Sequence, residues 1–126
     1  MKKIIIDTNF LVVPFKYRID IFSEFNRICN FNYKLYIFKQ SILELKNIIE
    51  KQFGKDKKAA QFALKLIKLK NIGIINSEDM DVDSLILNNL PKDSIVATQD
   101  NFLKKKLRDK GISVIILRQK KYLQFV

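Results

Sequence analysis

The stretch KKIIIDTNFLVVPF, residues 2–15, runs three consecutive isoleucines into a single carboxylate. Ile4, Ile5 and Ile6 predict a short strand buried on both faces, because they show no alternation with polar residues. Asp7 follows where such a strand would end. A carboxylate in that place has no evident helix-capping duty, so its purpose depends on where the other acids of the chain fall.

Four further apolar runs look like buried strands, because they are short and rich in isoleucine, valine and aromatic residues. The expected strands cover residues 3–7, 34–38, 72–75, 94–98 and 112–117. Apolar residues at helical spacing lie between them, most clearly over 56–70. The expected helices cover residues 20–30, 42–53, 56–70, 81–89 and 101–109. Gly111 is a candidate for the C′ position of the last helix. This alternation predicts an α/β fold whose parallel sheet is covered by helices on both faces.

Length and composition exclude several classes of protein. A chain of 126 residues is expected to form one domain, residues 1–126. Cys29 is the only cysteine and there is no histidine, so internal disulfides and histidine general bases are excluded. No apolar run approaches the ~20 residues of a membrane span, and Asp7 interrupts the first apolar run too early for a signal peptide. We therefore expect a cytoplasmic protein without membrane contact.

The formal net charge is +11, from 24 basic and 13 acidic residues. A small basic domain often binds nucleic acid. The plainer explanation is solubility in a protein whose composition favours lysine. Charge alone leaves both explanations open.

The acids fall at the ends of the expected strands. Asp7 ends the first strand, Glu44 follows the second, and Asp100 follows the fourth by two residues. Asp83 lies in the first turn of the helix after the third. Ligands of an open parallel sheet bind beyond the carboxyl ends of its strands, so these four acids should share one edge. Four close carboxylates repel, and a divalent cation such as Mg²⁺ or Mn²⁺ would relieve that repulsion.

Most of these acids also have a purely structural explanation. Ser41 and Glu44 have the spacing of a capping box. Asp81 and Asp83 stand at a helix start, where the helix dipole favours negative charge. Asp100 suits the N-cap of residues 101–109. The coincidence of all four acids at one sheet edge favours the metal site.

Taken in order, these segments resemble the PIN-domain nucleases, above all the archaeal and eukaryotic branch that processes small-subunit ribosomal RNA. The likeness spans nearly the whole chain. It is carried by the stretches IIIDTNFLVVPFKYRIDIFSEF (4–25), SILELKNI (41–48), DVDSLIL (81–87) and IVATQDNFLKKKLRDKGISVIILR (95–118). The resemblance implies a five-stranded parallel sheet of order 3-2-1-4-5 with helices on both faces.

The resemblance also implies a site. Its catalytic and metal-binding acids are Asp7, Glu44, Asp83 and Asp100, with Asn9 and Thr98 as small polar neighbours. The family often has paired aspartates before the helix that follows strand three. Here that pair is reduced to Asp83 beside Ser84, with Asp81 upstream, so either Asp81 or Asp83 completes the site.

The activity expected from this resemblance is Mg²⁺- or Mn²⁺-dependent endoribonuclease action, in ribosomal RNA processing. An alternative within the family is a VapC-type toxin ribonuclease held by an antitoxin. The expected partners are RNA, a second copy of the chain, and an antitoxin or a ribosome-assembly protein.

A group of basic residues follows Asp100. Lys104, Lys105, Arg108 and Lys110 could hold the phosphates beside the cleaved bond, or could simply form a solvated helix face. At the C-terminus, Tyr122, Leu123 and Phe125 could cover a sheet edge or pack on a partner.

Two other classes of function compete with the nuclease. A non-catalytic RNA-binding scaffold has no use for four repelling acids. A phosphoacceptor receiver domain needs an acidic pair at the end of strand one and a lysine at the end of strand five. This chain has Ile6 before Asp7, and Leu117-Arg118 in the last of these positions.

Overall fold

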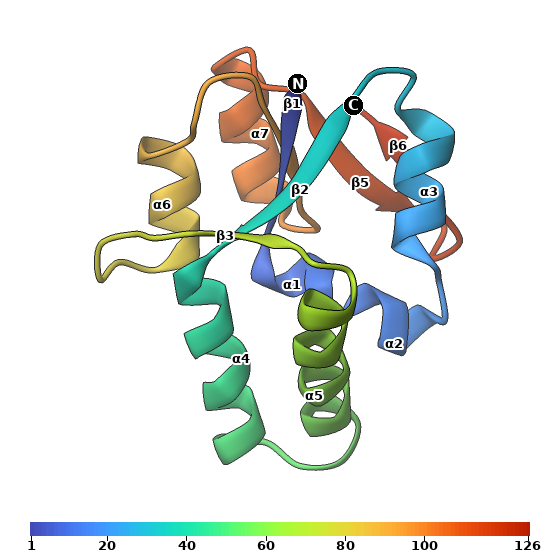
Figure 1. Ribbon diagram of the computed structural model, residues 1–126, viewed down its shortest axis with the longest axis vertical. Helices are drawn as coiled ribbons and strands as arrows, with labels where there is room; N and C mark the ends of the chain where they lie inside the picture. Colours follow the sequence, from blue (N-terminus) through green and yellow to red (C-terminus); the bar gives the residue numbers. More distant parts are fainter.

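The computed structural model describes residues 1–126 and contains six strands and seven helices (Figure 1). In chain order these are β1 (Lys2–Ile6), α1 (Thr8–Leu11), α2 (Val13–Tyr17), α3 (Ile21–Ile28), β2 (Tyr33–Phe38), α4 (Lys39–Lys51), α5 (Gly54–Leu69), β3 (Gly73–Ile75), α6 (Val82–Asn88), β4 (Ser94–Ala97), α7 (Asn101–Asp109), β5 (Val114–Arg118) and β6 (Tyr122–Phe125).

The strands form one sheet of order β3-β2-β1-β4-β5-β6. The first five are parallel, with Ile4 of β1 opposite Leu35 of β2 and Ile95 of β4, and β6 runs antiparallel to β5. The predicted order of the first five strands is confirmed, but the predicted number was wrong. The sixth strand contains the C-terminal residues that we expected at a sheet edge or on a partner.

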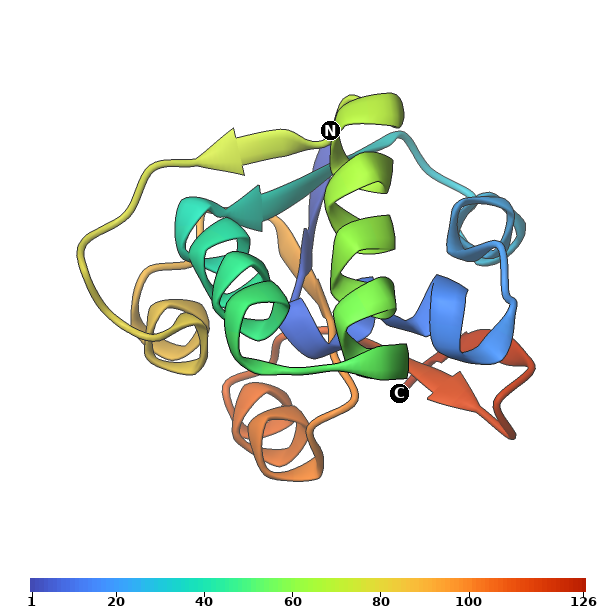
Figure 2. The ribbon, with the colours of Figure 1, turned by 90° about the horizontal axis from the view of Figure 1, so that it is seen from below.

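The side chains of β1 serve both faces of the sheet. Ile4 and Ile6 belong to a core shared with α3 and α5, whereas Ile5 belongs to a second core shared with α6 and α7. Figure 2 shows these helix pairs on opposite sides of the sheet. All three isoleucines are fully buried, and burial of each contributes about 1.5–3 kcal/mol. Helices on both faces were predicted and are confirmed.

The segment after β1 forms two short helices, α1 and α2, that were not predicted. Phe10 of α1 is fully buried, and its ring centroid lies 6.2 Å from that of Phe25 in α3. Pro14 stands in the first turn of α2, where its missing N–H costs no hydrogen bond. These helices turn the chain across the carboxyl end of β1 and so form one wall of the site described below.

Helix α4 begins at Lys39, three residues before its predicted start. Ser41 and Glu44 therefore both lie inside the helix, so the alternative explanation of this pair as a capping box was wrong. The Ser41 hydroxyl is instead buried, with its oxygen 2.8 Å from that of Thr8 in α1. Glu44 therefore lies in the second turn of α4 and does not cap the start of that helix.

The end of α7 matches its prediction. Gly111 has a φ of 76°, and its N–H bonds to the carbonyl of Arg108 while that of Ile112 bonds to Leu107. This pair of bonds is the Schellman motif, which satisfies carbonyls left free at a helix end.

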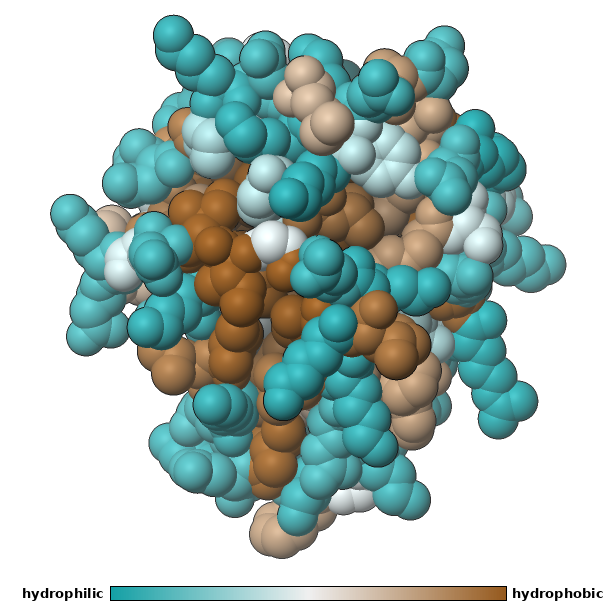
Figure 3. All heavy atoms as spheres, in the orientation of Figure 1, coloured by the Kyte–Doolittle hydropathy of each residue, from teal (hydrophilic) through white to brown (hydrophobic).

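The surface seen in Figure 3 carries apolar side chains near its centre, over β3 and the ends of α4 and α5 that lie beside it (Figures 1 and 3). Leu43, Leu69 and Ile74 are large apolar residues of this region with substantial exposure. A membrane-spanning segment needs more length and hydrophobicity than any helix of this structure has.

Candidate active site

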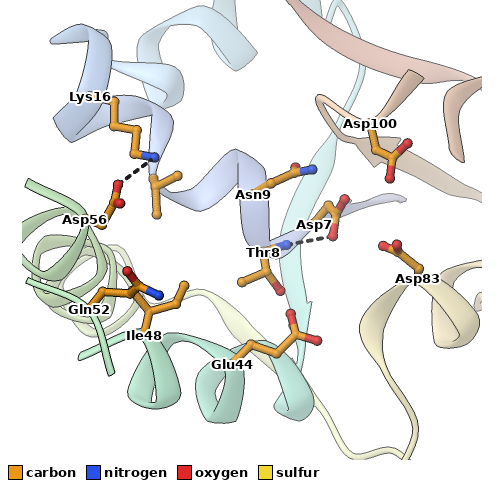
Figure 4. A pocket seen from close by; sticks show the side chains of 11 residues that line it. Asp7, Thr8, Asn9, Lys16, Glu44, Ile48, Gln52, Asp56, Asp83 and Asp100 are labelled. Carbon is orange, nitrogen blue, oxygen red and sulfur yellow. Dashed lines mark hydrogen bonds and ion pairs between the residues drawn. The ribbon is translucent and has the colours of Figure 1, made fainter. Parts of the chain in front are cut away.

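A cavity of about 480 Å³ lies beyond the carboxyl ends of the central strands (Figure 4). The acids predicted from the strand ends all line it, although they come from four different junctions of the fold. They are Asp7, Glu44, Asp83 and Asp100. In Figure 4 their side chains gather at one end of the cavity, while Lys16 and Asp56 form an ion pair at the other end.

Asp7 is the most deeply buried acid, with only 3% of its surface exposed. One carboxylate oxygen accepts a hydrogen bond from the Thr8 backbone N–H at 2.8 Å, and the other accepts one from the Thr98 hydroxyl at 2.7 Å. Asp7 is also the N-cap of α1, so the expectation that it had no capping duty was wrong. That cap fixes the orientation of the side chain without removing it from the cavity.

The pKa of Asp7 is raised from its usual 3.8 to about 6, and burial is the largest cause of this net shift. The hydrogen bonds from Thr98 and Thr8 oppose the rise, while the negative charges of Asp83 and Glu44 contribute to it. A cation beside such a carboxyl group would favour its ionised form and so lower the pKa again.

Thr98 and Asn9 support the acids. The Thr98 hydroxyl donates to Asp7 and accepts from the Asp100 N–H at 3.1 Å, so it links two acids without lining the cavity. Asn9 lines the cavity, and its side-chain oxygen accepts a hydrogen bond from the Gln99 N–H at 3.3 Å. Both residues therefore connect the end of β1 to the loop after β4.

Glu44 also bridges two elements. One of its carboxylate oxygens accepts a hydrogen bond from the Val82 N–H, at 3.3 Å, across the gap between α4 and the first residue of α6. Its position in the second turn of α4, rather than at the helix start, directs it toward the other acids (Figure 4).

Asp100 has two roles at once. It is the N-cap of α7, as the sequence predicted, and one oxygen accepts hydrogen bonds from the Phe102 and Leu103 N–H groups. Its carboxylate also faces the cavity (Figure 4). A structural role and a place in the site therefore coexist in this residue.

The structure separates Asp81 from Asp83. Asp81 is the N-cap of α6 and accepts hydrogen bonds from the Ser84 N–H and hydroxyl, which lower its pKa. Asp83 lines the cavity, and its pKa is raised by burial and by the charges of Asp100, Asp81 and Glu44. The acid that joins the other three in the cavity is Asp83.

This separation predicts different outcomes for the same substitution at the two positions. We expect Asp83→Asn to reduce the RNA cleavage that the resemblance implies by at least about tenfold, since it removes a charge from the cluster. Asp81→Asn should retain near-wild-type cleavage and melting temperature, because Asn is also a good N-cap. Cleavage rates and thermal melts of the two variants decide the matter. Loss of activity in Asp81→Asn alone would contradict this assignment.

The donor set of the cavity suits a hard divalent cation. All four acids present oxygen ligands, which Mg²⁺ and Mn²⁺ prefer. No three acidic or cysteine side chains lie close enough together to hold one ion by themselves. Mg²⁺ typically takes one or two carboxylates and keeps several waters, so the residues present fit it.

Several cavity residues were missed at the level of sequence. They are Thr8, Val12, Lys16, Ile48, Gln52 and Asp56. A signal existed for two of them, because Ile48 and Gln52 follow Glu44 at i+4 and i+8 and so share its helix face. Thr8, Val12 and Lys16 depended on α1 and α2, which were not predicted.

The predicted basic group lies outside the cavity. Lys104, Lys105 and Arg108 line a separate hollow on α7 together with Asn101 and Asp109. Lys110 stands apart, and its ammonium donates a hydrogen bond to the Leu87 carbonyl at 2.7 Å. Because Asp100 caps α7, the hollow begins beside the acidic end of the cavity.

A mostly parallel sheet of this order, with acids at the carboxyl ends of its strands, defines the PIN-like class of α/β domains. The family model described as "PIN like domain" matches residues 4–120, and the chain belongs to that family.

Two relatives extend over most of the chain. Ribonuclease VapC4 of Methanocaldococcus jannaschii is 35% identical over 126 residues, covering 98% of this chain and 96% of that protein. Ribonuclease VapC9 of Archaeoglobus fulgidus is 30% identical over 118 residues, covering 93% of this chain and 84% of that protein. Among solved structures, the PIN domain endonuclease Utp24 superposes with a TM-score of 0.81 at 21% identity, covering 98% of this chain and 90% of that one. This last likeness confirms the fold.

Proposed function

We propose that this protein is a divalent-metal-dependent endoribonuclease of the VapC toxin type. The observation that carries the proposal is the gathering of four acids, from four junctions of the sheet, in one cavity around a buried Asp7. The two ribonuclease relatives support RNA as the substrate. They also favour the toxin alternative over ribosomal RNA processing, because both are VapC ribonucleases, whereas the likeness to Utp24, at 21% identity, is one of fold.

Asp7, Glu44, Asp83 and Asp100 are the residues that would hold the metal, one or two of them as direct ligands and the others through its bound waters. When bound, the ion would supply an acidified water as nucleophile and offset negative charge at the phosphate. The protein's own contribution is orientation. Hydrogen bonds from Thr98, Val82 and Phe102 fix three of the acids before substrate arrives.

We assign the α7 hollow to RNA phosphates. Lys104, Lys105 and Arg108 line one concave surface that starts next to Asp100, whereas Lys110 is engaged with α6. Phosphate contacts position a strand without reading its bases. The hollow should therefore affect affinity more than the choice of cleavage site.

Replacing Lys104 and Lys105 by Ala should weaken RNA binding and leave the cleavage positions unchanged. The log–log salt dependence should flatten by about 0.7 for each phosphate of a single strand that is no longer neutralised. Lys110→Ala should change this slope less, because its ammonium is bonded to a carbonyl. Binding isotherms at several salt concentrations test this. An unchanged slope in the double variant would show that the lysines of the hollow are solvated and do not contact RNA phosphates.

A toxin-type ribonuclease is held by an antitoxin, and that is the protein partner we propose. Induced expression of the chain alone should arrest growth of a bacterial host, and co-expression of a small protein encoded beside its gene should restore growth. Expression of Asp7→Asn should be harmless. Accumulation of uncut ribosomal RNA precursors on deletion of the gene, without growth arrest on expression, would instead support the processing role.

A further inference from the structure

A second hollow adjoins the far end of the acidic cavity. It has a volume of about 540 Å³ and lies between α2 and the first turns of α5. Its lining is Pro14, Phe15, Lys16, Arg18, Gly54, Lys55, Lys58 and Phe62. Lys16 also lines the acidic cavity, so the two depressions meet at this residue.

The charge of this hollow has one sign. Four of its residues are cationic and none is acidic. Two counter-charges lie nearby in other hollows: Asp56, which pairs with Lys16 at 3.2 Å and lines the acidic cavity, and Asp20, which lines a neighbouring hollow with Arg18. A protein of net charge +11 has many lysines on convex helix surfaces. Four cations around one concave surface are different, because they repel one another unless an anion lies between them.

The hollow also contains an aromatic pair. The rings of Phe15 and Phe62 lie 5.7 Å apart, tilted by 52°. Phe62 falls in the apolar pattern that predicted helix 56–70, yet 39% of its surface is exposed. Cations that follow a phosphate backbone, combined with an aromatic face for a base, are the features by which proteins bind single-stranded nucleic acid.

We propose that this hollow, named here the α2–α5 subsite, binds single-stranded RNA on one side of the cleaved phosphate. Arg18, Lys55 and Lys58 contact phosphates, and a base stacks on Phe62. The acids lie between this subsite and α7, because Lys16 and Asp100 stand toward opposite ends of the acidic cavity in Figure 4. The strand thus crosses the acids from one basic surface to the other. The inference rests on the proposed function and extends its substrate contacts.

The test is binding of a fluorescent single-stranded oligoribonucleotide in EDTA, at several salt concentrations, with cleavage measured separately in Mn²⁺. Lys55→Ala/Lys58→Ala should weaken binding and flatten the log–log salt slope by about 1.4, since each lysine neutralises one phosphate. The matched control is Lys65→Ala/Lys68→Ala, two exposed lysines of the same helix outside the subsite, which should keep the wild-type slope.

Two single substitutions separate charge from stacking. Phe62→Leu keeps an apolar helix-forming side chain and should weaken binding by roughly 5- to 150-fold without changing the salt slope. Arg18→Gly should flatten the slope while preserving the fold, because Arg18 has a φ of 55° that glycine adopts freely. Thermal melts of each variant verify folding.

The outcomes distinguish this inference from the proposed function. If the wild type cleaves RNA and Lys55→Ala/Lys58→Ala binds like its control, the subsite is overturned and the nuclease stands. If binding depends on Lys55, Lys58 and Phe62 but no RNA is cut in Mn²⁺, the subsite stands and the nuclease falls. Equal loss of binding to polyglutamate, with no effect of Phe62→Leu, would overturn the subsite in favour of an acidic protein partner.

Discussion

Asp7→Asn should abolish RNA cleavage and at the same time make the metal-free protein more stable near neutral pH. Loss of a group that only orients a metal ligand typically costs about 10–100-fold, so loss of this central acid should cost more than about a hundredfold. The matched control is Asp20→Asn, which removes the same charge from the exposed N-cap of α3, where Asn can also cap.

The gain in stability follows from the raised pKa of Asp7. Because its pKa is about 6 in the folded protein against 3.8 ordinarily, the folded state binds this proton more tightly than the unfolded state. The free energy of unfolding of the wild type should therefore fall as pH rises from about 4 to about 6 and then level off. The full penalty is about 3 kcal/mol. Asn accepts only one of the two hydrogen bonds, so the net gain should be nearer ~2 kcal/mol.

Thermal melts in EDTA between pH 4 and pH 8 measure this effect. The wild-type melting temperature should fall by several degrees across the interval, because ~1 kcal/mol shifts it by roughly 3–5 °C at this chain length. The melting temperature of Asp7→Asn should fall less than that of the Asp20→Asn control. A variant that cleaves RNA like the wild type would remove Asp7 from the site.

Removal of divalent metal is the second change with a large expected effect. In EDTA, RNA cleavage should stop, and addition of Mg²⁺ or Mn²⁺ should restore it, because the acids of the cavity are the charged groups placed to position a cation at the phosphate. Mn²⁺ should also stabilise the folded protein and so raise its melting temperature. At a free Mn²⁺ concentration a hundred times the dissociation constant, the stabilisation is about 2.7 kcal/mol.

Contaminating nuclease is controlled by purifying Asp7→Asn in the same way as the wild type. The variant should show no cleavage in either metal and a smaller rise in melting temperature. Undiminished cleavage by the wild type in EDTA, absent from the variant, would show that the acids act without a metal.

The parallel strands and the meeting of the four acids at one edge could be predicted because they depend on short-range patterns and one topological rule, whereas the strand order came from the family resemblance. Apolar runs identified five strands, and parallel strands bring their carboxyl ends to one edge. The sixth strand was missed as a strand because the turn before it has Gln119 and Lys120 at positive φ, without the Asn or Gly that usually signals such a turn.

The local roles of the acids were harder to predict, because they depend on element boundaries. Residues 10–15 are an almost unbroken apolar run with no helical period, so α1 was not predicted. Without α1, the role of Asp7 as its N-cap could not be predicted either. The early start of α4 likewise changed Ser41 and Glu44 from capping residues to interior ones. Asp81 and Asp83 could be told apart only when the first residue of α6 was known.

The position of β1 in the sheet has a consequence for the order of events during synthesis. β1 leaves the ribosome first, but its pairing with β4 and the bond from Thr98 to Asp7 span about ninety residues of chain. Asp100 follows later still. A growing polypeptide therefore carries Asp7 through the synthesis of these residues without the Thr98 hydroxyl that orients its carboxylate. The four acids can meet only after Asp100 has left the ribosome, so the acidic cavity forms late relative to the strand that carries Asp7.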